Sequence, residues 1–377
     1  MKILALLLAI GVATAWIPRP EPWWAVQTAL LALGAAWAFS GELRRLRPSP
    51  WLAVLATGAL WPWVQVLAGA TVNAATTRAA SLQWTAWLAA YAITEAAARR
   101  DEVRRLWMLR AFAAFAVMQA LVAILQRFTA EGRIFWIFDS GYRTGQMGPW
   151  VYDNQYAGFV LMLMPLTLWR ARGWTFAAPA LLVASVFVSG SLAGSMLVVA
   201  EALVVLALRG DAPVRRFAGV AVLAAAMLGV TGWEALNEKL RRDAPLKVRT
   251  QLTLATVEMA RDRPWLGWGL GTWSTVYPAY ARFDDGAFDN QAHNDWVQWA
   301  AEGGVPFFAV TLMLAAGALA AAWRTGWAVG LAFVLAHCVI EYHFQQRPVF
   351  GAVFFTLAAL ARAEMGVTRP RRNGGRT

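Results

Sequence analysis

Long apolar runs recur along this chain, and each is long enough to cross a lipid bilayer. A transmembrane helix needs about 20 mainly apolar residues to cover roughly 30 Å of hydrocarbon. The runs lie near residues 3–17, 23–39, 51–67, 81–98, 106–126, 155–169, 174–189, 192–208, 216–232, 304–322, 327–342 and 348–362. We therefore predict an all-α, polytopic membrane protein of about twelve transmembrane helices.

The composition supports this class. Of the 377 residues, 59% are hydrophobic and only 15% are charged, whereas a soluble domain carries about 25% charged residues. The 22 tryptophans suit the interfacial belts of a membrane protein. A net charge of +12 would suggest a nucleic-acid partner if the chain were soluble. In a membrane protein the position of each basic residue is more informative than the total charge. We therefore expect no nucleic-acid partner. The single cysteine, Cys338, excludes an intramolecular disulfide.

The positions of the basic residues predict the orientation. Lysine and arginine gather in alternate short connections and in the tail, and cytoplasmic loops are the ones enriched in them. Both termini are therefore expected in the cytoplasm. The expected organisation is helices 1 to 9 within 1–231, including an outer segment near 127–154, then a large outer loop at 232–303, helices 10 to 12 within 304–365 and a cytoplasmic tail at 366–377. Residues 1–15 could also be a cleaved signal peptide, which would leave this topology unchanged.

The large outer loop has internal order. Residues 248–261 have the apolar pattern of an amphipathic helix, and Pro264 ends it. Gly267, Gly269 and Gly271 then alternate with larger residues. Such glycines allow positive φ or a close approach of the backbone to a ligand. A structural turn against the membrane surface is an equally good interpretation.

The next polar segment is His293-Asn294-Asp295-Trp296, at the expected entrance of a helix. An imidazole there could act as a general base near neutral pH. Alternatively, His293 caps the helix or forms a local hydrogen bond. Glu302 follows nine residues later and could pair with an arginine, orient a base or stand as a solvated carboxylate.

Other polar candidates lie near the outer ends of expected helices. Arg143, Asn154 and Arg249 belong to the outer segments. A guanidinium group can bind a phosphate bidentately, through two parallel N–H···O hydrogen bonds, so the arginines are candidate ligands of a pyrophosphate. Each arginine could instead extend towards lipid headgroups.

Near the end of the chain, His337 and Glu341 are spaced one helical turn apart, followed by His343 and Arg347. Ionisable groups in a membrane are functional candidates. A metal site of His337, Glu341 and His343 is conceivable, but the spacing matches no familiar zinc motif, so we expect no metal.

In this order, these motifs resemble the O-antigen ligase and polymerase superfamily of bacterial membrane glycosyltransferases. The resemblance runs from about residue 130 to 360. It is carried by the 143–154 segment, Ser189-Gly190-Ser191, Arg249, Pro264-Trp265-Leu266-Gly267-Trp268-Gly269-Leu270-Gly271, His293-Asn294, Glu302-Gly303, and His337 with Glu341. The chain departs from the family at Ser189-Gly190-Ser191, where members often have an arginine after the serine.

The resemblance implies a GT-C-like scaffold in the bacterial inner membrane, a large helical periplasmic loop and an active site facing the periplasm. The donor would be a glycan on undecaprenyl pyrophosphate, held next to membrane lipid and used without a metal or other cofactor. His293 and Arg249 would be catalytic, and transfer would invert the anomeric centre. The substrate-binding residues would be Arg143, Asn154, Asn294, Glu302, His337, Glu341 and Arg347.

The acceptor is left open by the sequence. Lipid A-core would make the chain a ligase, another lipid-linked repeat a polymerase, and a protein an O-oligosaccharyltransferase. We favour the ligase because the chain lacks the large soluble C-terminal domain of many protein glycosylases. A transporter or flippase would instead place charges inside its spans and contain inverted repeats, and a structural component of a polysaccharide-export complex is a third interpretation.

Overall fold

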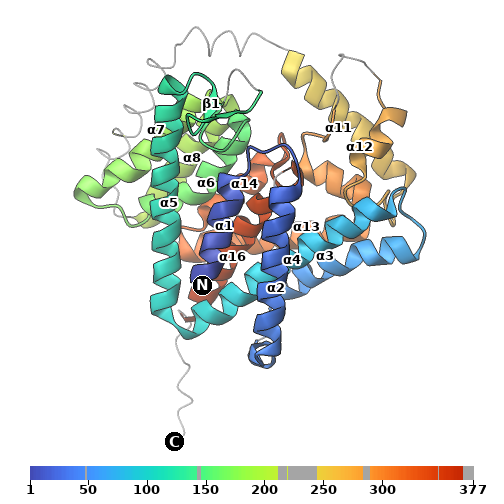
Figure 1. Ribbon diagram of the computed structural model, residues 1–377, viewed down its shortest axis with the longest axis horizontal. Coiled ribbons are helices and arrows are strands. Elements are labelled where there is room, and N and C mark those ends of the chain that lie inside the picture. The colour runs from blue at the N-terminus through green and yellow to red at the C-terminus, as the bar shows by residue number, and fades with distance from the viewer. Residues whose placement is uncertain are drawn as a thin grey trace, which may run out of the picture.

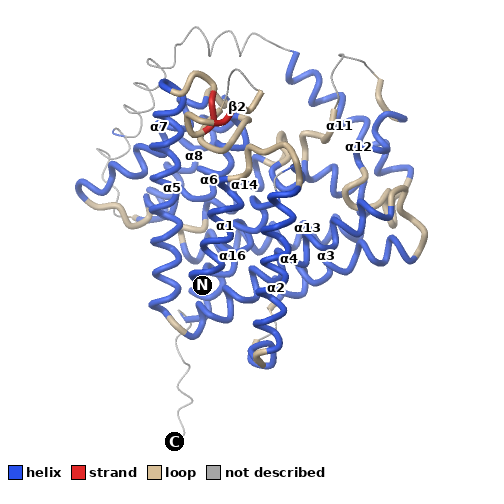
Figure 2. The backbone as a smooth tube through the Cα atoms, in the orientation of Figure 1, coloured by secondary structure: helices blue, strands red, loops and turns tan. Residues whose placement is uncertain are grey.

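The computed structural model describes residues 1–46, 49–141, 146–210, 219, 244–282, 289–346 and 348–367. Helices make up most of these residues, and Figure 2 shows the short β1–β2 hairpin as the only strand pair among them. The first helices are α1 (Lys2–Ala13), α2 (Glu21–Phe39), η1 (Glu42–Arg45), α3 (Pro50–Leu67), α4 (Ala74–Arg100) and α5 (Glu102–Thr129). The hairpin of β1 (Arg133–Ile134) and β2 (Phe138–Asp139) follows, and then α6 (Asp153–Leu168), η2 (Gly173–Phe176), α7 (Ala177–Ser189) and α8 (Leu192–Arg209). The remaining elements are α11 (Ala244–Asp262), α12 (Trp273–Val276), η3 (Tyr277–Ala279), α13 (Asp295–Thr325), α14 (Val329–His337), α15 (His343–Gln346) and α16 (Pro348–Val367).

Side-chain caps start several of the long helices. Ser49, Asn73, Asp101, Ser191 and Asn294 precede α3, α4, α5, α8 and α13, and each side chain accepts a hydrogen bond from a backbone N–H in the first turn. Such a cap satisfies one of the four N–H groups that a helix start leaves without a partner. The polar residues between the apolar runs therefore fix where the helices begin.

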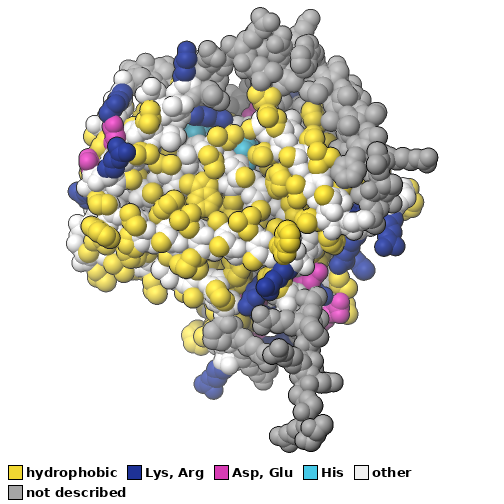
Figure 3. Space-filling view, turned by 180° about the vertical axis from the view of Figure 1, so that it is seen from behind, with side chains coloured by type: hydrophobic (Ala, Val, Ile, Leu, Met, Phe, Trp, Pro, Cys, Tyr) yellow, Lys and Arg dark blue, Asp and Glu magenta, His cyan; other side chains and the backbone are white. Residues whose placement is uncertain are grey.

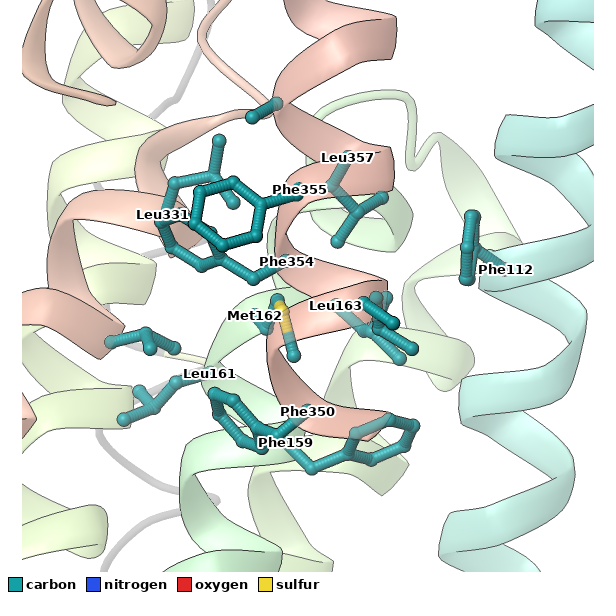
Figure 4. Packing of buried hydrophobic residues seen from close by; sticks show 14 of the residues in the cluster. Phe112, Phe159, Leu161, Met162, Leu163, Leu331, Phe350, Phe354, Phe355 and Leu357 are labelled. Atoms are coloured by element: carbon teal, nitrogen blue, oxygen red, sulfur yellow. The ribbon is translucent and has the colours of Figure 1, made fainter. Parts of the chain in front are cut away.

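The helices pack in two connected groups. In one, α4 packs against α2, α3 and α16, and in the other, α6 packs against α5, α7, α8 and α14. Buried aromatic and aliphatic side chains fill the contact between the groups, as Figure 4 shows for Phe159 of α6 and Phe350 and Phe354 of α16. Their burial makes one continuous core.

Among the described residues, five helices are long and apolar enough to cross a membrane: Pro50–Leu67, Glu102–Thr129, Leu192–Arg209, Asp295–Thr325 and Pro348–Gly366. Hydrophobic side chains cover much of one broad face, with basic and acidic groups mainly towards its margins (Figure 3). A soluble protein rarely exposes so much contiguous apolar surface. The chain is a polytopic helical membrane protein; the count of about twelve spans stays a prediction, and the span expected at 216–232 lies outside the described residues.

The hairpin and α11 lie at the upper end of the molecule in Figure 1, whereas the N-terminus lies towards the lower end. The first helix, α1, packs against α2 and α16 and buries Leu4, Leu8 and Val12. The amphipathic helix expected at 248–261 is confirmed, because α11 covers these residues and buries Leu252, Ala255 and Met259. The tight turn expected between the seventh and eighth runs is confirmed as well, with Gly190 at φ +79°.

Helix α13 consists of two helical segments. Gly304 has φ +73° inside it, so the backbone leaves the helical conformation at this residue. The N–H of Val305 donates to the carbonyl of Pro264, at 2.7 Å, instead of continuing the helix. The first segment, 295–303, begins directly after His293, and the second is the apolar run expected at 304–322.

Candidate active site

His293 lies immediately before α13 in an unusual backbone conformation. Its φ is +51°, in the left-handed region that non-glycine residues rarely adopt. Asn294, and not His293, caps the helix by accepting a hydrogen bond from Val297 N at 3.2 Å. The capping interpretation of His293 is therefore wrong, because its side chain is turned away from the helix start to a partner elsewhere in the chain.

That partner is Glu341. Nδ1 of His293 lies 2.9 Å from Oε1 of Glu341, and Nη2 of Arg249 lies 3.6 Å from the same oxygen. The carboxylate is nearly buried, whereas the side chains of His293 and Arg249 keep 28% and 26% of their surface exposed. The rings of His293 and Tyr342 also pack edge to face, with their centroids 4.4 Å apart. We call His293, Glu341 and Arg249 the histidine cluster.

Asp295 joins the start of α13 to the connection between α14 and α15. Its N–H donates to the carbonyls of Cys338 and Glu341, at 3.0 and 3.3 Å, and its Oδ2 accepts from the N–H of Phe344 at 3.2 Å. On the other side of His293, the N–H of Ala292 donates to Oε1 of Gln298 at 3.0 Å. The backbone is thus held on both sides of His293, which explains how the left-handed conformation is maintained.

The helical spacing expected between His337 and Glu341 is wrong. Helix α14 ends at His337, and Glu341 lies beyond it in the connection to α15. The chain leaves the helix there because the carbonyls of Cys338 and Glu341 accept the N–H of Asp295. His337 contacts His343 instead, with Nδ1 and Nε2 3.0 Å apart and both rings buried. Among the described residues, no group of three or more histidine, cysteine or acidic side chains is placed to hold a metal ion.

The glycine-rich segment forms a structural turn. Gly267, Gly269 and Gly271 all have positive φ, as expected. A Cβ on Gly267 would lie 2.3 Å from the backbone oxygen of Glu302, and one on Gly269 would lie 2.2 Å from Oγ1 of Thr71. The backbone of the glycine segment therefore approaches α13 and the α3–α4 connection closely. This favours the structural turn over a backbone that approaches a ligand.

Glu302 connects this turn to α13. Its two carboxylate oxygens accept from the backbone N–H groups of Gly271 and Trp273, each at 2.9 Å, and Oε1 also accepts from Nε2 of Gln298. The side chain is buried. This is a structural position, and a role of Glu302 in substrate binding stays a prediction.

Gln65 of α3 also binds the backbone of the glycine turn and of α13. Its Nε2 donates to the carbonyl of Glu302, at 2.7 Å, and to that of Leu266, while its Oε1 accepts from the N–H of Leu270 at 3.1 Å. Sequence reasoning missed Gln65, although a fully buried glutamine inside an apolar run is itself a signal, because a buried amide needs partners.

Asn154 meets the Ser189-Gly190-Ser191 turn at the start of α6. Its Oδ1 accepts a hydrogen bond from the hydroxyl of Ser191 at 2.5 Å. The two motifs that resemble the family are therefore adjacent here even without the arginine that relatives carry. Arg143 and Arg347 lie outside the described residues, and their predicted contacts with a pyrophosphate stay predictions.

The fold and the histidine cluster define a class: a helical membrane protein with a base-type side chain, a carboxylate and a cation gathered at one end of the bundle. Residues 156–312 match the family model described as O-antigen ligase. The match confirms, for these residues, the resemblance to the O-antigen ligase superfamily seen in the sequence. The matched stretch contains Arg249 and His293. No curated protein matches the chain.

The match to this family supports a glycan-transferring function of the ligase or polymerase type, with lipid-linked glycan and a glycan acceptor as the general kinds of partner.

Proposed function

We propose that this protein transfers a glycan from undecaprenyl pyrophosphate to a hydroxyl of lipid A-core at the periplasmic face of the bacterial inner membrane. The observation that carries the proposal is the histidine cluster, in which one buried carboxylate contacts both His293 and Arg249. In this arrangement the imidazole can take the proton of the acceptor hydroxyl, and the guanidinium can stabilise the charge of the pyrophosphate leaving group.

The carboxylate orients the base. With Glu341 ionised, Nδ1–H of His293 donates to it, and Nε2 carries the lone pair. As the acceptor oxygen forms its bond to the anomeric carbon, its proton passes to Nε2. The bond from that carbon to the pyrophosphate oxygen breaks on the opposite side, and undecaprenyl pyrophosphate leaves with the electron pair. Attack opposite to the leaving group inverts the anomeric centre. Glu341 acts through His293 and is a positioning residue.

Arg249 serves the leaving group. A guanidinium has five N–H donors, and the contact with Glu341 engages only part of this set. The other donors can bind pyrophosphate oxygens and stabilise the charge that grows as the bond breaks. We assign Arg143 and Arg347 the same role on the basis of the family resemblance, with Asn154, Asn294 and His337 as further substrate contacts.

The test is transfer by the full-length protein in lipid nanodiscs. Undecaprenyl-pyrophosphate-linked glycan and lipid A-core are supplied with EDTA, and product is followed by mass spectrometry. We expect wild-type transfer, and a loss of about 10²- to 10⁴-fold in His293→Asn, the scale of general-base catalysis. Asparagine tolerates the left-handed backbone better than most other non-glycine residues, so we expect this variant to keep the local fold.

The arginine claim has a matched control. Arg249→Ala should lower transfer strongly, whereas Arg261→Ala removes an exposed arginine from the same helix and should have little effect. Full activity of His293→Asn, or equal activity of the two arginine variants, would show the assignment to be wrong. Extension of the lipid-linked glycan without lipid A-core would identify a polymerase, and transfer to a protein would identify an O-oligosaccharyltransferase.

A further inference from the structure

A cavity of about 310 Å³ is lined in part by α13, the helix that begins two residues after His293. It is bordered by the connection between α1 and α2, by the first turns of α4 and by the start of α13. Gly271 of the glycine turn and Glu302 of α13 form part of its wall, but His293 and Glu341 do not line it. Trp299 and Glu302 of α13 line the cavity, and His293 lies two residues before this helix.

The lining combines indole rings with side-chain amides. Trp84, Trp87 and Trp299 form a buried aromatic floor, while Trp23 is half-buried and Trp24 is exposed towards the opening. Four glutamines also line it: Gln27, Gln83, Gln291 and Gln345. Primary amides offer both donors and acceptors. Indole faces suit the apolar C–H face of a sugar ring, and amides suit its hydroxyls.

The charged groups of the lining leave the interior close to neutral. Glu302 already accepts hydrogen bonds from two backbone N–H groups and from Gln298. Arg19 is exposed at the rim. A strongly charged ligand would therefore find no free opposite charge in the depth of the cavity, among the residues that the structure describes.

Two donors in this lining lack an acceptor. Nε1 of Trp23 and Nε2 of Gln345 are both buried, and neither has a hydrogen-bond partner among the described residues. Gln83 donates to the carbonyl of Phe344 at 3.3 Å, and so couples the wall of the cavity to α15. Buried donors without a partner are unfavourable, and a ligand that brings hydroxyl acceptors would satisfy them.

A second cavity has a lining of different chemistry. A groove of about 360 Å³ between α1 and α5 is lined almost entirely by apolar side chains such as Leu6, Trp107 and Phe112. That lining suits a lipid chain. The cavity between α2 and α4 has amides in place of aliphatic groups, and its size is at the lower end of the roughly 300–1,000 Å³ of small-molecule sites.

We infer that this cavity binds a neutral mono- or disaccharide unit of the glycan substrate, with the tryptophans stacking on the sugar ring and Trp23 and Gln345 donating to its hydroxyls. This subsite would hold one part of the glycan while its reacting end lies at the histidine cluster, near the start of α13. The inference rests on the proposed function for the source of the sugar, but binding itself needs no chemistry.

The test is saturation-transfer NMR on the full-length protein with free cellobiose, maltose and di-N-acetylchitobiose. Lipid nanodiscs are used because maltoside detergents carry a disaccharide headgroup. We expect signals from at least one disaccharide with the wild type, and binding about tenfold weaker in Trp23→Ala/Gln345→Ala, the scale of a lost ring contact and hydrogen bond. The matched control, Trp323→Ala/Gln251→Ala, removes the same groups from exposed positions and should bind like the wild type.

If the double variant does not give a folded, monodisperse protein, Trp23→Phe/Gln345→Leu removes the two donors while keeping most of the volume. Absence of any disaccharide signal above empty nanodiscs, or equal weakening in the control variant, overturns the inference. His293→Asn should bind disaccharide like the wild type. A protein that binds sugar without transferring glycan would contradict the proposed function alone, and one that transfers glycan without binding sugar here would contradict the cavity assignment alone.

Discussion

At the scale of single residues, the shared oxygen of Glu341 makes the positions of His293 and Arg249 interdependent. His293 and Arg249 both contact Oε1 of this buried carboxylate. Without it, the imidazole would lose the group that fixes its orientation, and Arg249 would lose the anion that holds it near the ring. A buried carboxylate is costly to maintain, so its placement between two partners indicates a function beyond packing.

Glu341→Gln tests this arrangement. Glutamine can still accept a hydrogen bond from Nδ1, but it is neutral and stabilises a protonated imidazole less. Hydrogen bonds to charged groups contribute about 1.5–3 kcal/mol, so we expect kcat to fall roughly ten- to a hundredfold. The check is kcat and KM for transfer, with melting temperature as the folding control. An unchanged kcat would contradict the positioning role of Glu341.

At the scale of elements, the glycine turn attaches the large loop to the helical bundle. Gln65 of α3 and Glu302 of α13 bind its backbone from two sides. Arg263 adds a third contact, because its guanidinium donates to the carbonyl of Ala70 and lies 3.9 Å from the ring centre of Trp268. The loop that carries Arg249 is thereby fixed relative to the start of α13, which carries His293.

Gly304→Ala should weaken this attachment. The new Cβ would lie 2.4 Å from the carbonyl oxygen of Trp265, and the backbone φ of +73° disfavours alanine. We expect a loss of stability of about 1–3 kcal/mol, measured as a lower melting temperature. Gly41→Ala is the matched control, because Gly41 has φ +81° but nothing within 4 Å of a Cβ. Equal effects of the two substitutions would show that backbone strain alone, without the clash, explains the change.

At the scale of the whole molecule, local sequence signals predicted more than long-range ones. Apolar runs and caps are properties of neighbouring residues, so α11 and the turn at Gly190 could be predicted from the sequence. The contact between His293 and Glu341 joins residues 48 positions apart, and no spacing rule predicts it. The apolar run predicts Glu341 on a helix, but α14 ends before it, where the N–H of Asp295 donates to the carbonyls of Cys338 and Glu341. Gln65 was missed for the same reason, since its partners are distant in sequence.

The break at Gly304 separates the start of α13, next to His293, from the segment that is long and apolar enough to cross the membrane. The carbonyls of Ala301, Glu302 and Gly303 accept from Trp268, Gly269 and Trp61, all outside α13. A change in bilayer thickness tilts a transmembrane helix to relieve hydrophobic mismatch. Here such a tilt would act on residues 305–325, while 295–303 stays fixed to the glycine turn. Transfer should therefore vary little among nanodiscs made with lipids of increasing acyl-chain length, and a steep dependence on chain length would mean that the two segments move as one helix.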